Sequence, residues 1–288
     1  MAASQEFRGE AKVSADTARS SEVIIRPCQG NNELRACVAL QKEVWKFNDA
    51  DLVPLRIFVV AGKIGGQIIG AFAGDALVGF AFSIPGMRFG QPYLHSHMLA
   101  VRETYRDSGL GRRLKLAQRA EALERGIDLI EWTFDPLEIK NGHLNLARLG
   151  AIARRYSVDH YGSSSSPLQG GLPTDRLVAE WWLKSKRVVG LLEHSESPQF
   201  QVIRKIAVPA QVYEWKASAA ERAKAGDVQK RNREEFLVAF ALGFAVLGYE
   251  RDQQDNGTFL LGRWDEQEWD GGPWEKDAPQ TPARSEGQ

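Results

Sequence analysis

The sequence predicts a mixed α/β fold with a smaller α+β region at its C-terminal end. A strand-like run followed by a helical segment opens the folded part, and a hairpin pattern comes next. A continuous apolar run near the middle of the chain is typical of a strand buried on both faces. Together these patterns give a strand and helix order that neither an all-helical nor an all-β domain would show.

The two ends of the chain differ in composition from the rest. Residues 1–20 are polar without an apolar period, and residues 269–288 are rich in Gly, Pro, Asp and Glu, so both are predicted to be disordered tails. Between them, we expect a main domain over residues 21–186 and a smaller α+β region over residues 187–268.

The main domain is divided by turn residues into short elements. A β-branched run ends at Pro27, Gly74 and Asp75 separate two strands, Gly126 ends a helix, and Asp135 follows the buried apolar run. In order, the predicted elements are a strand at 23–26, a helix at 31–47, a hairpin of 67–73 and 76–83, a strand at 93–101, a helix at 109–125, a strand at 127–134, a helix at 144–155, and strands at 156–161 and 176–183.

The C-terminal region is predicted to form a strand, a helix and a hairpin. A strand at 201–208 ends at Pro209, and Ser218 with Glu221 matches a capping box at the start of a helix. The Asp-Asn-Gly turn at 255–257 predicts a hairpin. The aromatic side chains on the late helix face are expected in the core, and they are Phe236, Phe240 and Phe244.

Composition limits the possible functions. The 288 residues contain 37 Lys and Arg against 37 Asp and Glu, so no overall field attracts nucleic acid or a membrane, and any anion needs a local site. Cys28 and Cys37 are too few for a disulfide framework and lack a metal spacing. Without a signal peptide or an apolar run long enough to span a membrane, a cytoplasmic protein is expected.

The segment from Met98 to Leu114 predicts a strand, a turn and a helix. Gly109 and Gly111 remove side chains where the backbone enters the helix, so successive amides can point at one anion. The helix N-terminus adds partial positive charge, and Arg106 and Arg112 add full charges. This combination suits a pyrophosphate, whereas the glycines alone would fit any tight turn.

The Leu-Ala-Val strand, the four-residue connector and the Arg-x-x-Gly-x-Gly segment resemble motif A of the Gcn5-related N-acetyltransferases (GNAT). The resemblance covers roughly residues 22–185, and it implies a mostly antiparallel central sheet flanked by helices. It also implies acetyl-CoA or another acyl-CoA as co-substrate, held by loop, helix start and strand. The implied cofactor-binding residues are Leu99, Ala100, Val101, Arg106, Ser108, Gly109, Leu110, Gly111 and Arg112.

The chain further resembles an uncharacterised branch of this superfamily that carries a C-terminal extension. Many members place an asparagine after the buried strand, then a tyrosine that protonates the departing thiolate. Asn141 or Asn145 matches the asparagine, but no tyrosine lies between Asn141 and Gly150. Tyr161, or Tyr156, from the following strand could replace it.

Aminolysis of a thioester also needs a group that removes a proton from the ammonium. Alternation along the strand places His95 and His97 on one side together with Leu99 and Val101, and a histidine titrates in the required range. Glu131 is the next candidate base, with an ion pair to an arginine as its structural alternative. A third ligand for a zinc site is missing, so no metal is expected.

The leading function is therefore transfer of an acyl group, most simply acetyl, to a primary amine of a small molecule by direct attack in a ternary complex. Asp175 and Arg176 could hold the acceptor's amine or carboxylate. The alternatives are a longer or carboxylated acyl group, CoA-ester decarboxylation, or a non-catalytic module that binds CoA or a partner. The C-terminal region would close over the site or form a homodimer.

Overall fold

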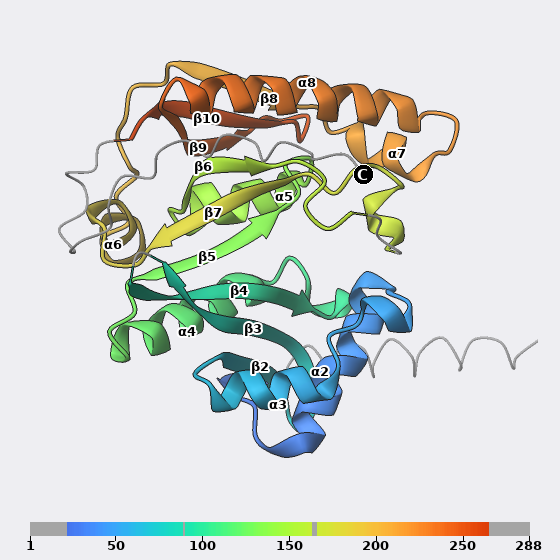
Figure 1. Ribbon diagram of the computed structural model, residues 1–288, viewed down its shortest axis with the longest axis vertical. Helices are drawn as coiled ribbons and strands as arrows, with labels where there is room; N and C mark the ends of the chain where they lie inside the picture. Colours follow the sequence, from blue (N-terminus) through green and yellow to red (C-terminus); the bar gives the residue numbers. More distant parts are fainter. Residues whose placement is uncertain (1–21, 89, 163–165, 265–288) are drawn as a thin grey trace, which may run out of the picture.

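The computed structural model describes residues 22–88, 90–162 and 166–264, so the predicted tails at 1–20 and 269–288 lie outside the described residues. The described chain forms a ten-stranded sheet in the order β1-β2-β3-β4-β5-β7-β6-β9-β10-β8 (Figure 1). The strands are β1 (Val23–Pro27), β2 (Gln67–Ala73), β3 (Ala76–Arg88), β4 (Gln91–Val101), β5 (Leu129–Phe134), β6 (Ile152–Ser157), β7 (Arg176–Trp182), β8 (Arg204–Val208), β9 (Phe244–Arg251) and β10 (Gly257–Arg263). β4 and β5 pair in parallel and the other pairings are antiparallel, which confirms the predicted fold class.

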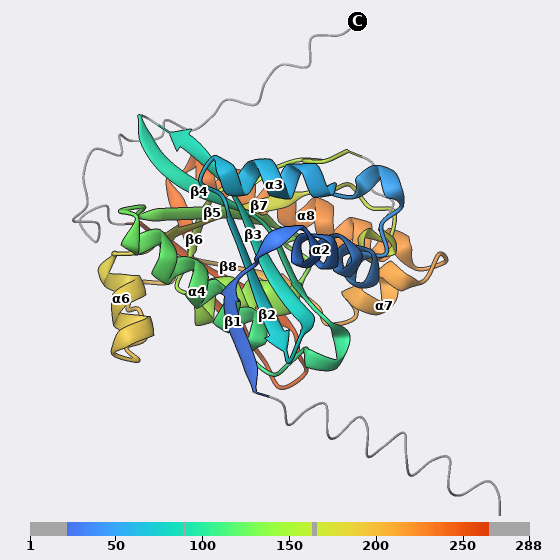
Figure 2. The ribbon, with the colours of Figure 1, turned by 90° about the horizontal axis from the view of Figure 1, so that it is seen from below.

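Helices cover both faces of the sheet. They are α2 (Gly30–Trp45), α3 (Leu55–Lys63), α4 (Leu110–Glu124), α5 (Ile139–Gly142), α6 (Lys186–Glu193), α7 (Val212–Ala217) and α8 (Arg222–Ala241). Figure 2 shows α2 and α3 on one side of the N-terminal strands and α4 on the other. Phe58 of α3 packs with Phe80 and Phe82 in one core cluster, whereas Leu114 of α4 packs in another. None of the helices in the described part is long and apolar enough to cross a membrane.

Several predicted elements agree with the structure because local chemistry determined them. The β2–β3 and β9–β10 hairpins form where turn residues separated apolar runs. Helix α4 ends before Gly126, whose φ of 72° permits the left-handed turn that a helix end requires. Strand β5 lies fifth in the sheet with both neighbours paired, as its apolar composition predicted.

The predicted helix at 144–155 is wrong in its second half. A helical turn over His143–Arg148 is followed by Gly150 at φ 76°, and the chain then enters β6. Pairing of Ile152 with Glu180 and of Ala153 with Ala179 outweighs the helical spacing of the sequence. Because β6 ends at Ser157, Tyr161 lies in the turn after the strand and not on it.

Four short helices, α3, α5, α6 and α7, were missed, and one predicted helix cap is wrong. Helix α3 begins after Pro54 although its sequence is β-branched, because Phe58 and Ala61 gain burial against α2 and the sheet. Helix α7 ends at Ala217, so Ser218 is the C-cap of that helix and not the start of a new one. Helix α8 begins later, with Glu221 as its N-cap and no capping side chain.

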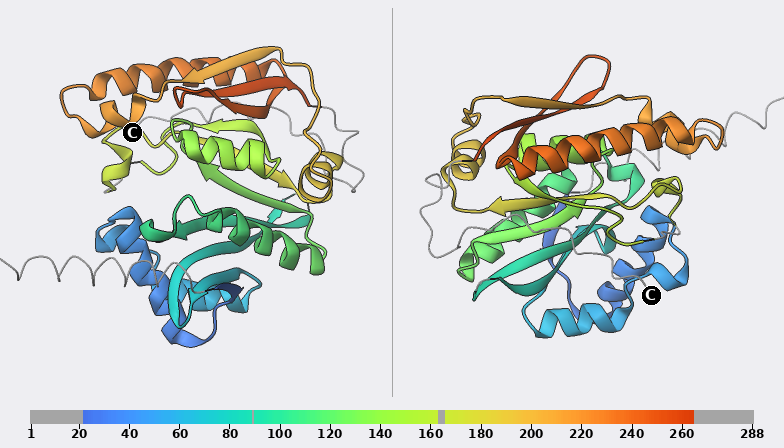
Figure 3. Two further views of the ribbon diagram at one scale, coloured as in Figure 1. Left: turned by 180° about the vertical axis from the view of Figure 1, so that it is seen from behind. Right: turned by 45° about the horizontal axis from the view of Figure 1, so that its top comes forward.

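The strands beyond residue 187 extend the same sheet. β9 joins β6 through the Ala153–Val246 pair, and α8 lies across the outer strands in Figure 3. The largest core cluster contains Ala153 and Trp181 together with Phe236 and Phe259 of the C-terminal region. Phe236, Phe240 and Phe244 belong to or border this core, as expected, but Phe244 begins β9 and does not lie on the helix face.

A buried carboxylate ties α8 to the loop before β7. Asp175 is fully buried and accepts hydrogen bonds from Tyr156 Oη at 2.7 Å and from Arg233 Nε at 2.7 Å.

Replacing Asp175 with Asn should lower the free energy of unfolding by roughly 3–5 kcal/mol, since one partner of a buried pair is removed. Urea denaturation measures this, and Asp255→Asn at the exposed Arg251 pair should cost less than about 1 kcal/mol. Equal losses in the two variants would contradict the assignment.

Candidate active site

The parallel strands β4 and β5 are paired only at Leu94–Ile130 and His95–Glu131. Beyond these two pairs the strands separate, and the residues that follow them line a pocket. They are Ser96, His97, Met98 and Leu99 of β4 and Trp132, Thr133 and Phe134 of β5. The open end of the strand pair therefore exposes unpaired backbone groups to a cavity, which is where a ligand can bind them.

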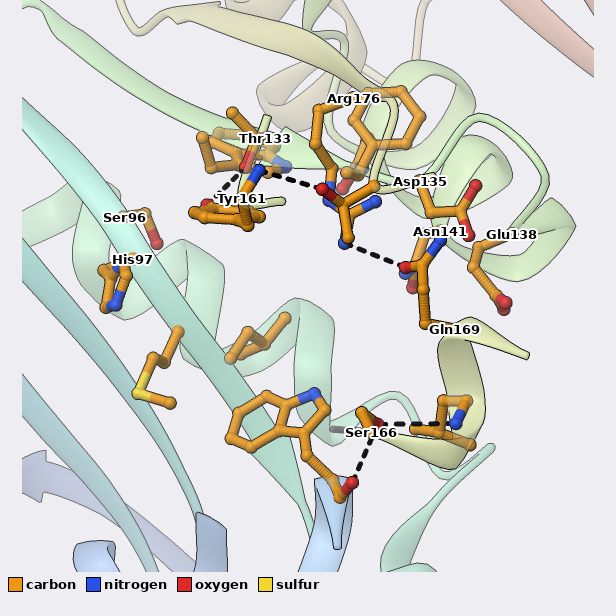
Figure 4. Close-up of a pocket in the computed structure, with 18 of the residues that line it drawn as sticks. Ser96, His97, Thr133, Asp135, Glu138, Asn141, Tyr161, Ser166, Gln169 and Arg176 are labelled. Carbon is orange, nitrogen blue, oxygen red and sulfur yellow. Dashed lines mark hydrogen bonds between the residues drawn. The ribbon is translucent and has the colours of Figure 1, made fainter. Parts of the chain in front are cut away.

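The cavity has a volume of about 560 Å³, enough for part of an extended cofactor together with a small acceptor. Trp45, Phe47 and Val53 close one side from the end of α2 and the segment after it. Figure 4 shows Ser96 and His97 at one end of the pocket and Glu138, Asn141 and Gln169 at the other. Leu144 and Asn145 complete the wall behind Asn141.

A bulge in β4 changes which residues share a face. The register shifts so that Phe82 pairs with Met98 while Ser83 pairs with Ser96, which leaves His97 as the extra residue. Beyond the bulge, Leu99 and Val101 pack with the cluster of α4. The expectation that His95, His97, Leu99 and Val101 share one side is therefore wrong past His97, because strict alternation does not survive a bulge.

The predicted phosphate-binding segment adopts a turn that leads directly into α4. Gly109 is the N-cap of α4 with φ 79°, and Asp107 is also left-handed with φ 60°. Gly109 carries no side chain that could cap the helix, so the first-turn amides keep no internal acceptor. Leu110 is buried against the core and anchors the helix start, while Gly111 has only Leu99 near its missing Cβ. The geometry suits an anion at this end of the helix.

The two predicted phosphate arginines lie at the surface of this turn. Arg106 is exposed and donates from Nε to the carbonyl of Val101 at 3.4 Å, and Arg112 donates to the carbonyl of Arg148 at 3.3 Å. Ser108 is exposed and its hydroxyl donates to the Tyr105 carbonyl at 2.7 Å. Both guanidinium groups therefore keep further N–H groups that an anion could accept.

The strand and asparagine positions implied by the resemblance lie along the same passage. Leu99 lines the pocket, Ala100 is fully buried next to it, and Val101 borders the α4 cluster. Asn141 is exposed and Asn145 is buried, and both line the pocket. Of the predicted cofactor-binding residues, Leu99, Asn141 and Asn145 therefore line the pocket, and those of the turn and helix start lie outside its lining.

The two histidines are neighbours with ring centroids 6.1 Å apart, but they differ in access to the pocket. His97 lines the pocket, and its ring meets Phe82 edge to face. Burial lowers the pKa of His97. Burial and the nearby His97 lower the pKa of His95 to about 4, and His95 is not among the pocket-lining residues. His97 is therefore the better-placed base.

Glu131 lies beside the last strand pair and is held by two arginines. Its carboxylate is 4% exposed and accepts from Arg88 and, at 2.6 Å, from Arg155. Glu180 pairs with Arg154 at 2.6 Å and with Arg155 at 3.3 Å, so three arginines and two carboxylates form one network within the sheet. Glu131 does not line the pocket. The structure thus places it in a structural ion-pair network away from the reacting space.

Tyr161 lies at the pocket and Tyr156 does not. The hydroxyl groups of Tyr161 and Thr133 share a hydrogen bond of 2.9 Å across the pocket wall (Figure 4). The Tyr161 amide also donates to Thr174 Oγ1 at 2.8 Å, which fixes the loop after β6. Tyr156 stacks on Phe236 and donates to Asp175, so it is a packing residue.

Asp175 and Arg176 have different roles despite being adjacent. Asp175 is buried with Arg233 and cannot reach an acceptor. Arg176 lines the pocket, where its Nη2 donates to Gln169 Oε1 at 3.2 Å, and its guanidinium lies 5.4 Å from the centre of the Tyr161 ring. Arg176 is therefore the residue of this pair that can meet a ligand.

The C-terminal region supports the pocket from behind. Lys216 of α7 is buried and contacts Glu138 Oε1 at 2.8 Å and Asp135 Oδ2 at 3.1 Å, and both carboxylates line the pocket. Burial lowers the pKa of Lys216, but the two carboxylates outweigh it, so the net shift is upward. A cationic lysine thus neutralises this part of the pocket wall.

Sequence reasoning missed several lining residues. Trp45 ends helix α2, Phe47 lies in the segment after it and Thr133 lies near the end of β5, and their positions depend on the tertiary fold. Lys115 is a charged residue of α4, yet it is 2% exposed and lines the pocket. Its spacing from Gln118 and Ala122, which are also buried, is the helical signal that could have identified it.

Comparison with known proteins agrees with this geometry. Residues 31–144 match the family model described as "Acetyltransferase (GNAT) family". No curated protein sequence matches the chain.

Similar solved structures include the ribosomal-protein-S18-alanine N-acetyltransferase of Escherichia coli, at 15% identity over 55% of this chain and 92% of that chain, with a TM-score of 0.44. Naa50 of Arabidopsis thaliana, in complex with a bisubstrate analogue, shows 15% identity over 55% and 97% with a TM-score of 0.44. A GNAT acetyltransferase of Streptococcus pneumoniae shows 15% identity over 55% and 98% with a TM-score of 0.45. These likenesses are too distant to assign an acceptor.

The matched segment contains most of the residues that line the pocket, from Trp45 at the end of α2 to Leu144 after α5. Residues 31–144 therefore match the GNAT acetyltransferase family, and the chain is an N-acetyltransferase-like enzyme whose co-substrate is acetyl-CoA or another acyl-CoA.

Proposed function

We propose that this enzyme transfers an acyl group from coenzyme A to a primary amine of a small molecule, by direct attack within a ternary complex. The observation that carries the proposal is the pocket between the separated strands β4 and β5, which is lined by Leu99 on the strand that leads to the turn at Gly109 and, on another side, by Trp45 and Phe47. One passage can thus hold donor and acceptor at once.

The donor would enter from the helix end. Its pyrophosphate would accept hydrogen bonds from the first-turn amides of α4 and from Arg106 and Arg112, as the exposed turn allows. The pantetheine arm would run along the free edge of β4 at Leu99, where unpaired backbone groups can bind its amides. The thioester carbonyl would then lie near the bulge at His97, where a backbone N–H can polarise it.

The acceptor would enter from the side of Trp45 and Arg176. His97 would take a proton from the ammonium, and the neutral amine nitrogen would form a bond to the thioester carbon. The C–S bond then breaks, and the sulfur receives a proton from the hydroxyl of Tyr161, which the hydrogen bond to Thr133 orients. The nitrogen loses its second proton, which restores the Tyr161 hydroxyl, and His97 releases the first proton to solvent. The products are an amide and free coenzyme A.

A thiol-release assay tests this function most directly. Acetyl-CoA is mixed with a panel of primary amines, including amino acids, polyamines and amino sugars, and release of coenzyme A is followed at neutral pH. Turnover with one class of amine supports the proposal. Binding of acetyl-CoA without turnover on any amine would favour a non-catalytic CoA-binding module, and hydrolysis or decarboxylation without an acceptor would favour the other reactions of the scaffold.

Tyr161→Phe tests the proposed general acid. Removing only the hydroxyl should lower kcat by about tenfold to a hundredfold while leaving the KM for acetyl-CoA within about twofold, because the proton is needed when the thiolate leaves. Tyr105→Phe, at the half-buried tyrosine near the phosphate turn, is the matched control. An equal effect of the two variants on kcat would remove Tyr161 from this role.

The region after residue 186 would act as a support of the pocket and not as a separate unit. Lys216 contacts Asp135 and Glu138, and Arg233 holds Asp175 beside Arg176, so this region fixes three parts of the wall.

The sulfur atoms of Cys28 and Cys37 lie 3.8 Å apart as free thiols, and we propose a reducing, cytoplasmic location.

A further inference from the structure

A buried lysine lies at the closed end of the pocket. Lys115 of α4 is 2% exposed and lines the pocket together with Ser96 and Trp132. Ser96 and Trp132 come directly after the pairs Leu94–Ile130 and His95–Glu131, at which β4 and β5 meet. The Nζ atom is 2.7 Å from Ser96 Oγ and 3.7 Å from the centre of the Trp132 ring.

A chain of buried hydrogen bonds determines which way the Lys115 amine must point its protons. Gln67 Nε2 donates to the backbone carbonyl of Gln118, so Gln67 Oε1 is an acceptor and Ser83 Oγ donates to it at 3.0 Å. Ser83 in turn accepts from Gln118 Nε2 at 2.6 Å, so Gln118 Oε1 accepts from Ser96 Oγ at 3.0 Å. Ser96 has then used its proton, and Lys115 must donate to it.

One N–H of Lys115 is therefore used, and the rest of the amine faces the ring of Trp132 and the cavity. Within residues 22–88, 90–162 and 166–264, no carboxylate lies within ion-pair distance of Lys115. The other fully buried lysine of the described chain, Lys216, has two carboxylate partners. Glu131 cannot serve Lys115, because Arg88 and Arg155 already bind it.

An unpaired lysine is costly inside a protein, so its presence at a cavity points to an anionic partner that arrives with a ligand. A coenzyme A ester that follows β4 directs its acyl chain toward the end of the gap, where Lys115 lies. We propose that the acyl group carries a terminal carboxylate, as in a dicarboxylic half-thioester, and that the Lys115 ammonium binds it. This inference rests on the proposed acyl transfer and names its donor class.

The surroundings of Lys115 favour binding of the acyl carboxylate. Ser96 and the face of the Trp132 ring stabilise the ammonium, and His95 on the neighbouring strand stays neutral near pH 7 because burial and the nearby His97 lower its pKa to about 4. Burial also lowers the pKa of Lys115 well below its ordinary value in the absence of a ligand. Binding of the carboxylate would restore the charged form.

Matched donors provide the test. Malonyl-, succinyl- and glutaryl-CoA are compared with propionyl-, butyryl- and pentanoyl-CoA, which have the same chain lengths without the carboxylate, by calorimetric titration of the full-length protein. We expect at least one carboxylated donor to bind about tenfold or more tightly than its uncharged partner. In Lys115→Met, which keeps the stem on Trp132, the preference should disappear or reverse.

The ratio within one protein separates this inference from the proposed function. If a Lys115→Met protein is poorly folded, Lys115→Gln serves as the second variant, and thermal unfolding is measured for both. Wild-type protein that binds the uncharged esters as well as or better than all three carboxylated ones would overturn the inference and leave acyl transfer intact. Failure of every ester to bind would instead contradict the proposed function itself.

Discussion

The double variant Arg106→Glu, Arg112→Glu is expected to bind acetyl-CoA about 100-fold or more weakly than the wild type. Two carboxylates would replace two cations at the N-terminus of α4, where the pyrophosphate is proposed to lie, and repulsion would replace attraction. The fold should persist, because both side chains are at the surface and donate only to backbone carbonyls at 3.3–3.4 Å. Titration with acetyl-CoA and the KM for this donor measure the effect.

A charge-matched control makes this result specific. Arg35 and Arg56 are exposed on α2 and α3, so Arg35→Glu, Arg56→Glu changes the net charge equally at positions away from the turn. Its affinity for acetyl-CoA should stay within about threefold of the wild type. Equal weakening in the two double variants would mean that overall charge, and not the site at Gly109, governs binding.

The second large effect is expected at His97. His97→Gln should reduce kcat by about 100-fold or more and leave the affinity for acetyl-CoA nearly unchanged, since a general base contributes in the transition state. Burial lowers the pKa of His97, so the imidazole stays unprotonated to a lower pH than a free histidine. The rate should fall only as the pH drops below that lowered pKa, and this acid limb should vanish in the variant.

His95→Gln provides the comparison for the neighbouring ring. His95 has no place in the pocket wall, so its replacement should reduce kcat less than that of His97. The ring centre of His95 lies 6.1 Å from that of His97. Because His97 is still present in this variant, the acid limb of the pH profile should remain. A normal pH profile in His97→Gln together with a lost limb in His95→Gln would exchange the two assignments.

The sequence predicted the parts of this molecule that depend on local chemistry. The turn at Gly109 and the two hairpins follow from residues that only certain backbone angles accommodate, and these elements appear where expected. The predicted cofactor-binding residues came from one short motif, because its strand, turn and helix start are consecutive in the chain. Such features need no knowledge of distant segments.

The predictions that were wrong or missing concern features that depend on contacts between distant segments. Residues 152–155 have helical spacing but pair with β7, and α3 forms from β-branched residues because Phe58 reaches the core. The bulge at His97 leaves no mark in the sequence, yet it separates the faces of His97 and Leu99. Lys115 is a charged residue, and its burial results from the packing of α4 against the sheet and Trp132.

The most direct test of the central claim is calorimetric titration of the full-length protein with acetyl-CoA and with free coenzyme A at neutral pH. Because the pyrophosphate and the pantetheine arm are common to both, saturable binding of each to one site per chain is predicted, with competition between them. No detectable binding of either compound, in protein shown to be folded, would contradict the placement of a coenzyme A site between β4 and β5.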